Sequence, residues 1–349
     1  MAESPPETER IAPPPAVARP RHGRRVAGLL IALAVLALVA VASIAVGARA
    51  MPLGDVWHGL FHYGGTTNDV VVRDLRVPRT LLGVMVGLGL GLSGAVMQAL
   101  TRNPLAEPGI LGVNAGAAAA VVSAISFFGV STLSAFVWWA FLGAAVVSVV
   151  VYVLGGSRSA TPVRLALAGT AASAALVGYI NAVQLMDSQA LGKLRFWTVG
   201  SLASANMDTV RQVAPFLLAG TLLALTLGRS LNAMAMGDDT ARALGAHLTR
   251  TRIAAMAAIT LLCGAATAAC GPIVFVGLMI PHLARLITGP DMRWVLAYSA
   301  VLSPVLLLGA DVVGRVVTRP GELQVGIVTA LVGGPVFIHL VRRKRMAQL

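Results

Sequence analysis

The stretch VAGLLIALAVLALVAVASIAVGA (residues 26–48) is an apolar run without a single charged side chain. A helix needs about 20 such residues to cross the roughly 30 Å hydrocarbon core of a membrane. A helix that is apolar on all sides must also face lipid or the interior of a large protein. The run therefore predicts a membrane-spanning helix.

The rest of the chain extends this pattern. Of 349 residues, 57% are hydrophobic and 12% are charged, whereas soluble domains carry about 25% charged residues. Nine further apolar runs follow at residues 80–100, 109–128, 133–154, 163–186, 209–228, 252–270, 272–288, 294–313 and 325–341. The sequence thus predicts an all-α integral membrane protein with about ten transmembrane helices.

The net charge of +13 is concentrated at the chain ends. Nine of the 27 Lys and Arg residues lie there, namely Arg10, Arg19, Arg21, Arg24, Arg25, Arg342, Arg343, Lys344 and Arg345. Basic flanks on the first and last spans are typical of cytoplasmic loops, and both termini are therefore expected in the cytoplasm, which requires an even number of spans. This distribution favours the plasma (inner) membrane and its lipid over nucleic acid as the partner of the positive charge.

The composition divides the chain into three parts. Residues 1–25 are rich in Pro, Glu and Arg, and are expected to form a disordered cytoplasmic tail. Residues 26–345 are expected to form the transmembrane domain, and residues 346–349 a short C-terminal tail.

One break between spans is rich in proline. The stretch QALTRNPLAEPGILGVNAG (residues 98–116) contains Pro104 and Pro108, each of which lacks a backbone donor and disfavours helix in the residue before it. Irregular backbone at membrane depth must be buried in protein, line an aqueous path or lie at the surface. The break is therefore either a plain connection or a constriction at the inner mouth of a pathway.

Two other breaks are polar. Residues 187–206 are too polar to span and indicate a re-entrant or interfacial segment on the outer side. Within residues 229–252, a short helical pattern sets Asp238, Asp239 and Arg242 opposite Ala241, Leu244 and Leu248. This amphipathic segment is either a solvated surface helix or a helix that fits a groove on a partner.

Ionisable groups inside the spans are few, chiefly Asp311, Arg315, His282 and His339. Proton-coupled carriers usually place several carboxylates or histidines at a cavity within the membrane, so this set weakens the alternative of a secondary transporter. The sequence also lacks a Walker-type phosphate loop and the common zinc motifs. We therefore expect no catalytic site, cofactor or metal on this chain, and a membrane-embedded enzyme is a weak alternative.

Five motifs, taken in order, give the chain a family resemblance. They are RVPRTLLGVMVGLGLGLSGAVMQALTRNPLAEPGILGVNAGA (76–117), GDDTARALG (237–245), GPIVFVGLMIPHLARL (271–286), ADVVGR (310–315) and GELQVGIVTALVGGPVFIHLVRRK (321–344). With them the sequence resembles the FecCD, or type II, permeases of ATP-binding-cassette (ABC) importers for iron-siderophores, haem and vitamin B12. The segment LRFWTVGSL (194–202) and the basic ending are most similar to the ferric-enterobactin branch.

The resemblance implies a vitamin B12 permease-like fold and a set of partners. These are a second permease protomer, expected to be a related but non-identical chain, two cytoplasmic ATPase subunits that bind ATP and Mg, and an extracytoplasmic siderophore-binding protein. The expected substrate is a ferric-siderophore, with haem or cobalamin as alternatives.

The resemblance also assigns residues by motif position. Asn103 and Leu105 are expected at the cytoplasmic gate. Arg76, Arg79 and Arg315 are expected in an outward basic patch at an exposed rim, where each can grip a carboxylate of the binding protein. The coupling helix to the ATPase is expected at about residues 237–247, with the residues Gly237, Asp238, Asp239, Ala241, Arg242, Leu244 and Gly245.

Two stretches depart from the family pattern. Gln324 stands where many members have proline, and residues 161–163 read Thr-Pro-Val where small hydroxyl residues form a second gate layer. The start of the last helix and the second gate layer are therefore left open.

Overall fold

The computed structural model describes residues 22–156, 162–243 and 245–342, and in these ranges the regular structure is entirely helical. Seven helical stretches in this part of the chain are long and apolar enough to cross a membrane. They are α1 (His22–Ala45), α4 (Val77–Thr101) with the turns that lead into it, α6 (Leu133–Leu154), α7 (Pro162–Met186), α9 (Met207–Thr226), α12 (Leu248–Cys270) and α14 (Met292–Val317).

Three shorter apolar helices complete the bundle. They are α5 (Val113–Phe128), α13 (Val276–Thr288) and α15 (Val325–Arg342). Each lies on one of the ten predicted spans, so the all-helical membrane fold is confirmed. The short length of α5 and α13 has a sequence cause: both follow breaks at Pro108 and Pro272, where the backbone does not continue as α-helix.

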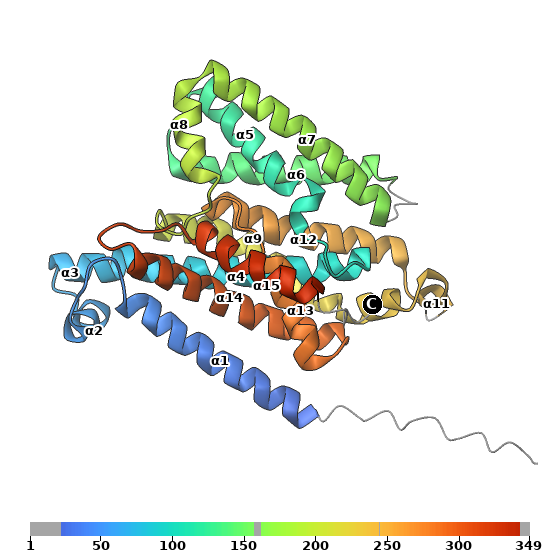
Figure 1. The fold of residues 1–349 in the computed structure, drawn as a ribbon, viewed down its shortest axis with the longest axis horizontal. Coiled ribbons are helices and arrows are strands. Elements are labelled where there is room, and N and C mark those ends of the chain that lie inside the picture. Colours follow the sequence, from blue (N-terminus) through green and yellow to red (C-terminus); the bar gives the residue numbers. More distant parts are fainter. Residues whose placement is uncertain (1–21, 157–161, 244, 343–349) are drawn as a thin grey trace, which may run out of the picture.

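The helices at the centre of the bundle are α4, α12 and α14 (Figure 1). In their most apolar windows 78%, 72% and 61% of the residues are buried, against 11% in α1 and 17% in α7. Figure 1 shows α1 and α7 on opposite flanks of the bundle. The two flanking helices therefore expose most of their apolar side chains to lipid or to another chain.

Glycine permits the closest helix contact in the core. Gly94 of α4 lies directly against the backbone of Gly277 in α13, and a Cβ atom on Gly94 would overlap the Gly277 carbonyl. Small residues allow this approach, which is the main source of helix association in lipid. Gln98, one turn further on, donates from Nε2 to the Leu278 carbonyl at 3.0 Å and locks the same contact.

Short helices occupy the breaks. Before α4 lie α2 (Leu53–Phe61), α3 (Thr67–Val70) and the π-helical turn η1 (Val71–Arg76), and after it lies the 3₁₀ turn η2 (Pro108–Leu111). The polar segment 187–206 contains α8 (Ser188–Trp197), and the loop before α12 contains α10 (Gly228–Ala235) and α11 (Asp238–Ala243). After α8, the Ser201 amide donates to the Cys270 carbonyl at 2.7 Å, which seats this irregular backbone inside the bundle.

The chain ends share one end of the bundle. Figure 1 places the start of α1 and the end of α15 toward the side that carries α11, and α3 at the opposite side. Arg25 near the start of α1 is tied there, because the Tyr298 hydroxyl donates to its carbonyl at 2.7 Å. Since α1 begins at His22, the predicted tail is shorter than 25 residues, and its first 21 residues and residues 346–349 lie outside the described part.

Candidate functional site at the two ends of the bundle

The α4–α5 loop (residues 102–112) begins with a sharp reversal. Arg102 adopts a left-handed conformation with φ of 49°, and the Asn103 amide donates to the Gln98 carbonyl at 3.1 Å, which closes the end of α4. Asn103 Oδ1 then accepts the Leu105 amide at 2.9 Å, so the side chain builds a local turn. Asn103 and Leu105 are both exposed, and Leu105 keeps 36% of its surface accessible. The two predicted gate residues thus stand together at the tip of the loop.

A partly buried carboxylate anchors the other half of this loop. Glu107 Oε1 accepts the amide of Phe275 at 3.2 Å. Phe275 has φ of 70° and is the residue that precedes α13, so its amide has no partner within that helix. The bond ties the α4–α5 loop to the break before α13, and it fixes the loop base while the tip stays exposed.

A short helix, α11, lies within the segment predicted as the coupling helix. Gly237 (φ 101°) and Gly245 (φ 81°) bracket it in conformations that side-chain-bearing residues rarely adopt. Ala241 is fully buried, whereas the Asp239 side chain is fully exposed and the Arg242 side chain is 64% exposed, and the two form an ion pair at 3.0 Å. The helix thus has one face on the bundle and one free face; Leu244 lies outside the described residues.

Asp238 differs from its neighbour because it faces the chain. Its carboxylate pairs with Arg102 of the α4–α5 loop and, at 2.7 Å, with Arg252 of α12. Partial burial raises the pKa of Asp238, but the hydrogen bond from Arg102 and the charge of Arg252 outweigh burial, so its pKa lies below the ordinary value. Asp238 is therefore ionised at neutral pH, as this bridge requires.

A charged cluster lies at the opposite end, where α4 begins and α14 ends. Asp311 of α14 is fully buried and lies 2.7 Å from Arg79 Nη2 and 2.7 Å from Arg315 Nη2. Arg79 Nη1 also contacts Glu322 Oε2 at 2.7 Å, in the connection between α14 and α15. Asp311 and Arg315 are four residues apart on one helix, a spacing at which side chains lie next to each other.

The arginine cluster is less exposed than the sequence predicted. Arg76 and Arg315 are 5% and 1% exposed, and both donate to carbonyl groups at the end of α1: Arg76 to Ala45 at 2.7 Å, and Arg315 to Ser43 at 2.8 Å. The last carbonyls of a helix lack intrahelical partners and carry a partial negative charge, which explains this capping. The prediction of an exposed rim is therefore wrong for Arg76 and Arg315. The three predicted arginines nevertheless lie close together.

The cluster opens into a pocket. A cavity of about 270 Å³ is lined by the three arginines together with Arg49 and Glu322, among others. Four arginines and one carboxylate, that of Glu322, line it, and the Glu322 side chain is 31% exposed. The pocket is therefore positively charged and accessible to an anionic group.

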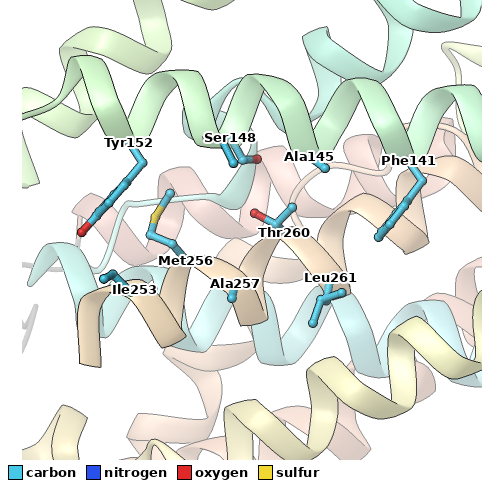
Figure 2. A pocket seen from close by; sticks show the side chains of 10 residues that line it. Phe141, Ala145, Ser148, Tyr152, Ile253, Met256, Ala257, Thr260 and Leu261 are labelled. Carbon is cyan, nitrogen blue, oxygen red and sulfur yellow. The ribbon is translucent and has the colours of Figure 1, made fainter. Parts of the chain in front are cut away.

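A second cavity has a different character. It measures about 410 Å³ and lies between α6 and α12, where Figure 2 shows Ser148 and Thr260 in the middle of an otherwise apolar lining. Phe141 and Leu261 lie at one end of it, and Tyr152 at the other. None of its lining side chains is charged at neutral pH, so this cavity suits hydrocarbon better than a charged solute.

Several residues of these sites were not predicted from the sequence, namely Arg102, Glu107, Arg252 and Glu322. Arg102, Glu107 and Glu322 lie within two residues of a Pro or Gly at a break, which is a usable signal, whereas Arg252 lies within α12. The sequence does not indicate the partners of any of the four. Among the described residues, no group of three or more His, Cys, Asp or Glu side chains lies close enough to hold a metal ion.

A bundle of apolar helices whose charged clusters lie at its two ends is the architecture of a membrane-embedded permease. The model of the FecCD transport family matches residues 34–343. The chain belongs to this family.

Individual relatives agree with this assignment. The ferric enterobactin transport system permease protein FepD of Escherichia coli is 46% identical over 322 residues, covering 91% of this chain and 95% of the relative. The hemin transport system permease protein HmuU of Yersinia pestis is 36% identical, with coverage of 91% and 95%. A solved metal-chelate type ABC transporter in an inward-facing conformation matches with a TM-score of 0.81 and 27% identity, covering 91% of this chain and 99% of that chain.

Proposed function

We propose that this chain is a permease subunit of an ABC importer that moves a ferric-siderophore across the plasma (inner) membrane by alternating access. The relative at 46% identity is a ferric enterobactin permease and the hemin permease is at 36%, which favours a siderophore over haem. Haem and cobalamin remain the alternative substrates.

The proposal rests on one observation: two different kinds of site lie at opposite ends of one bundle. The α11 end has a helix with a free face and an exposed loop tip, and the α3 end has a positively charged pocket. A transporter driven by one partner and loaded by another needs such an arrangement. A stand-alone carrier needs neither a surface for a driving partner nor a pocket for a loading partner.

At the α11 end, the free face of α11 is suited to an ATPase. Asp239 and Arg242 are exposed there, and the two flanking glycines hold the helix out from the bundle. We assign this helix, about residues 237–247, to the coupling contact. Two ATPase subunits with ATP and Mg would supply the energy, and this chain would make or break no bond.

At the same end, Asn103 and Leu105 form the cytoplasmic gate. Both are exposed at the tip of a loop whose base is fixed by Glu107. In a pair of permease protomers, two such tips facing each other across a central path would close it. The exposed apolar side chains of α7 provide surface for the second protomer, which we propose to be a related, non-identical chain.

At the α3 end, the arginine pocket receives a carboxylate of an extracytoplasmic binding protein. Arginine grips a carboxylate with two hydrogen bonds, and a positive field raises the association rate. Because Arg76 and Arg315 are buried by their capping bonds, the pocket rather than an exposed rim would be the point of entry. This orientation places the α11 end and both chain termini in the cytoplasm.

The test is purification of the tagged chain from detergent with mass spectrometry of its partners, followed by uptake of ferric enterobactin into proteoliposomes with and without ATP. We expect an ATPase and a second permease to co-purify, and uptake to require ATP. A chain that purifies alone and transports without ATP is a secondary transporter, and this result would overturn the proposal.

A further inference from the structure

Three segments of the chain meet at Asp238. One carboxylate oxygen pairs with Arg102, which is 136 residues away, and the other pairs with Arg252 Nη2 at 2.7 Å. Arg102 ends α4 and is followed directly by Asn103, Asp238 begins α11, and Arg252 lies in the first turns of α12. A single side chain thus joins the proposed coupling helix to the proposed gate.

The two adjacent carboxylates of α11 face in different directions. The Asp239 side chain is fully exposed and pairs within the helix, with Arg242. The Asp238 side chain is 31% exposed, and its partners Arg102 and Arg252 are 33% and 14% exposed. A partner that presses on the free face of α11 would meet Asp239, whereas Asp238 passes the displacement into this chain.

Arg102 is a suitable receiver of that displacement. It holds φ of 49°, in the left-handed region that costs free energy for any residue with a side chain. Its guanidinium bond to Asp238 compensates for this cost, because a charge-assisted hydrogen bond is among the stronger side-chain contacts. When the bond is lost, the Arg102 side chain no longer links the loop to α11, and the loop tip loses its fixed position relative to α11.

We propose that Asp238 is a positioning residue that joins α11 to the α4–α5 loop, so that the coupling helix and the gate move as one body. Arg252 completes the bridge and ties the same carboxylate to α12. The inference rests on the proposed function, because it takes α11 as the coupling contact and Asn103 as part of the gate.

The test compares Asp238→Asn with Asp208→Asn, which breaks an exposed ion pair in α9, in the complex purified with its ATPase and reconstituted in proteoliposomes. The readout is ferric enterobactin transported per ATP hydrolysed. We expect Asp238→Asn to retain ATPase association and hydrolysis but to lower this ratio about three- to thirtyfold, the range of a lost coupling contact. Asp208→Asn should change it less than about twofold, as for a surface ion pair.

Two further variants separate coupling from folding. Arg102→Gln removes the bond on the gate side and leaves Asp238 paired with Arg252, so it should fold normally and lower the ratio in the same way. Asp238→Glu keeps the charge and should restore at least part of the ratio. The melting temperature and the amount of co-purified ATPase are measured for each variant.

The outcomes are distinct. Normal transport per ATP in Asp238→Asn and Arg102→Gln, with the ATPase bound, would overturn the inference and leave the proposed function intact. A loss in Arg252→Gln without one in Arg102→Gln would also overturn it, because the link to the gate would be absent. A wild-type chain that captures no ATPase would overturn the proposed function and the inference together.

Discussion

Asp311 pairs with two arginines at once, Arg79 from the start of α4 and Arg315 one turn further along α14. The carboxylate is fully buried, and Arg315 in turn donates to the carbonyl groups of Ser43 and Val46 at the end of α1. One acidic side chain therefore joins α14, α4 and α1. The arginine pocket is built on this contact.

We expect Asp311→Asn to destabilise the protein strongly. The change removes the buried counter-charge of Arg315 and leaves Arg79 with Glu322 alone, and breaking a buried ion pair costs about 3–5 kcal/mol. Thermal unfolding in detergent measures the effect. Asp208→Asn serves as the control, because both side chains of the Asp208–Arg211 ion pair are exposed. It should lower stability by less than about 1 kcal/mol.

The same variant separates the importer from a proton-coupled carrier. In the proposed importer, Asp311 has a structural role, so any residual transport by Asp311→Asn keeps its dependence on ATP and is not driven by a proton gradient. Proton uptake measured beside substrate uptake decides this. An altered proton stoichiometry would assign Asp311 to ion coupling and contradict the reading of the cluster as a docking support.

Glu322 already occupies the position that a partner carboxylate would take. Its Oε2 lies 2.7 Å from Arg79 Nη1, at the pocket proposed for the binding protein. An incoming carboxylate must displace Glu322, so Glu322→Gln should tighten docking by about two- to fivefold, the size of a partly exposed ion pair. The affinity is measured by passing the purified permease complex over surface-immobilised binding protein.

The gain should be largest at low salt, because ionic screening weakens partly exposed charge pairs. Asp208→Asn removes a negative charge away from the pocket and should leave the affinity unchanged. Weaker docking of Glu322→Gln would show that Glu322 is part of the docking surface and not a competitor for Arg79.

At the other end, Asn103→Trp tests the gate. Asn103 is exposed, and its side-chain oxygen accepts the Leu105 amide, so the fold tolerates a change there and stability should alter by less than about 0.5 kcal/mol. A bulky ring at the loop tip should obstruct the path and lower the flux of ferric enterobactin in vesicles. Asn103→Asp keeps the bond to Leu105 and is the control. Unchanged flux in Asn103→Trp would make the loop a plain connection.

The spans could be predicted from the sequence because long apolar runs have few alternatives. The predicted run 133–154 agrees with α6, and the predicted run 26–48 differs from α1 by a few residues at each end. The short helices before α4 were missed, although Thr66 and Asp69 form a capping box that is visible as a Thr-x-x-Asp spacing. Short amphipathic helices between spans carry too little apolar length to be predicted by hydropathy.

The site could be predicted only in part. Pro104 and Pro108 indicated the irregular loop, and the amphipathic pattern indicated α11, because both depend on local sequence. The bridge from Asp238 to Arg102 joins residues 136 positions apart, and a single sequence does not indicate which helix ends lie side by side. For the same reason, burial of Arg76 and Arg315 against the end of α1 could not be foreseen.

Gly94→Ala tests the packing that brings α4 against α13. A Cβ atom there would overlap the backbone of Gly277, which cannot rotate away as a side chain can. Overpacking a tight core typically costs about 1–3 kcal/mol, and we expect a value at the upper end because the obstacle is main chain.

Gly309→Ala in α14 has open space around its Cβ position and is the matched control. It should be neutral or stabilising by up to about 1 kcal/mol, because alanine favours helix. Thermal unfolding of the two variants, side by side in one detergent, gives the comparison. Equal melting temperatures would mean that α4 and α13 are further apart than in this structure, and that Gln98 does not reach the Leu278 carbonyl.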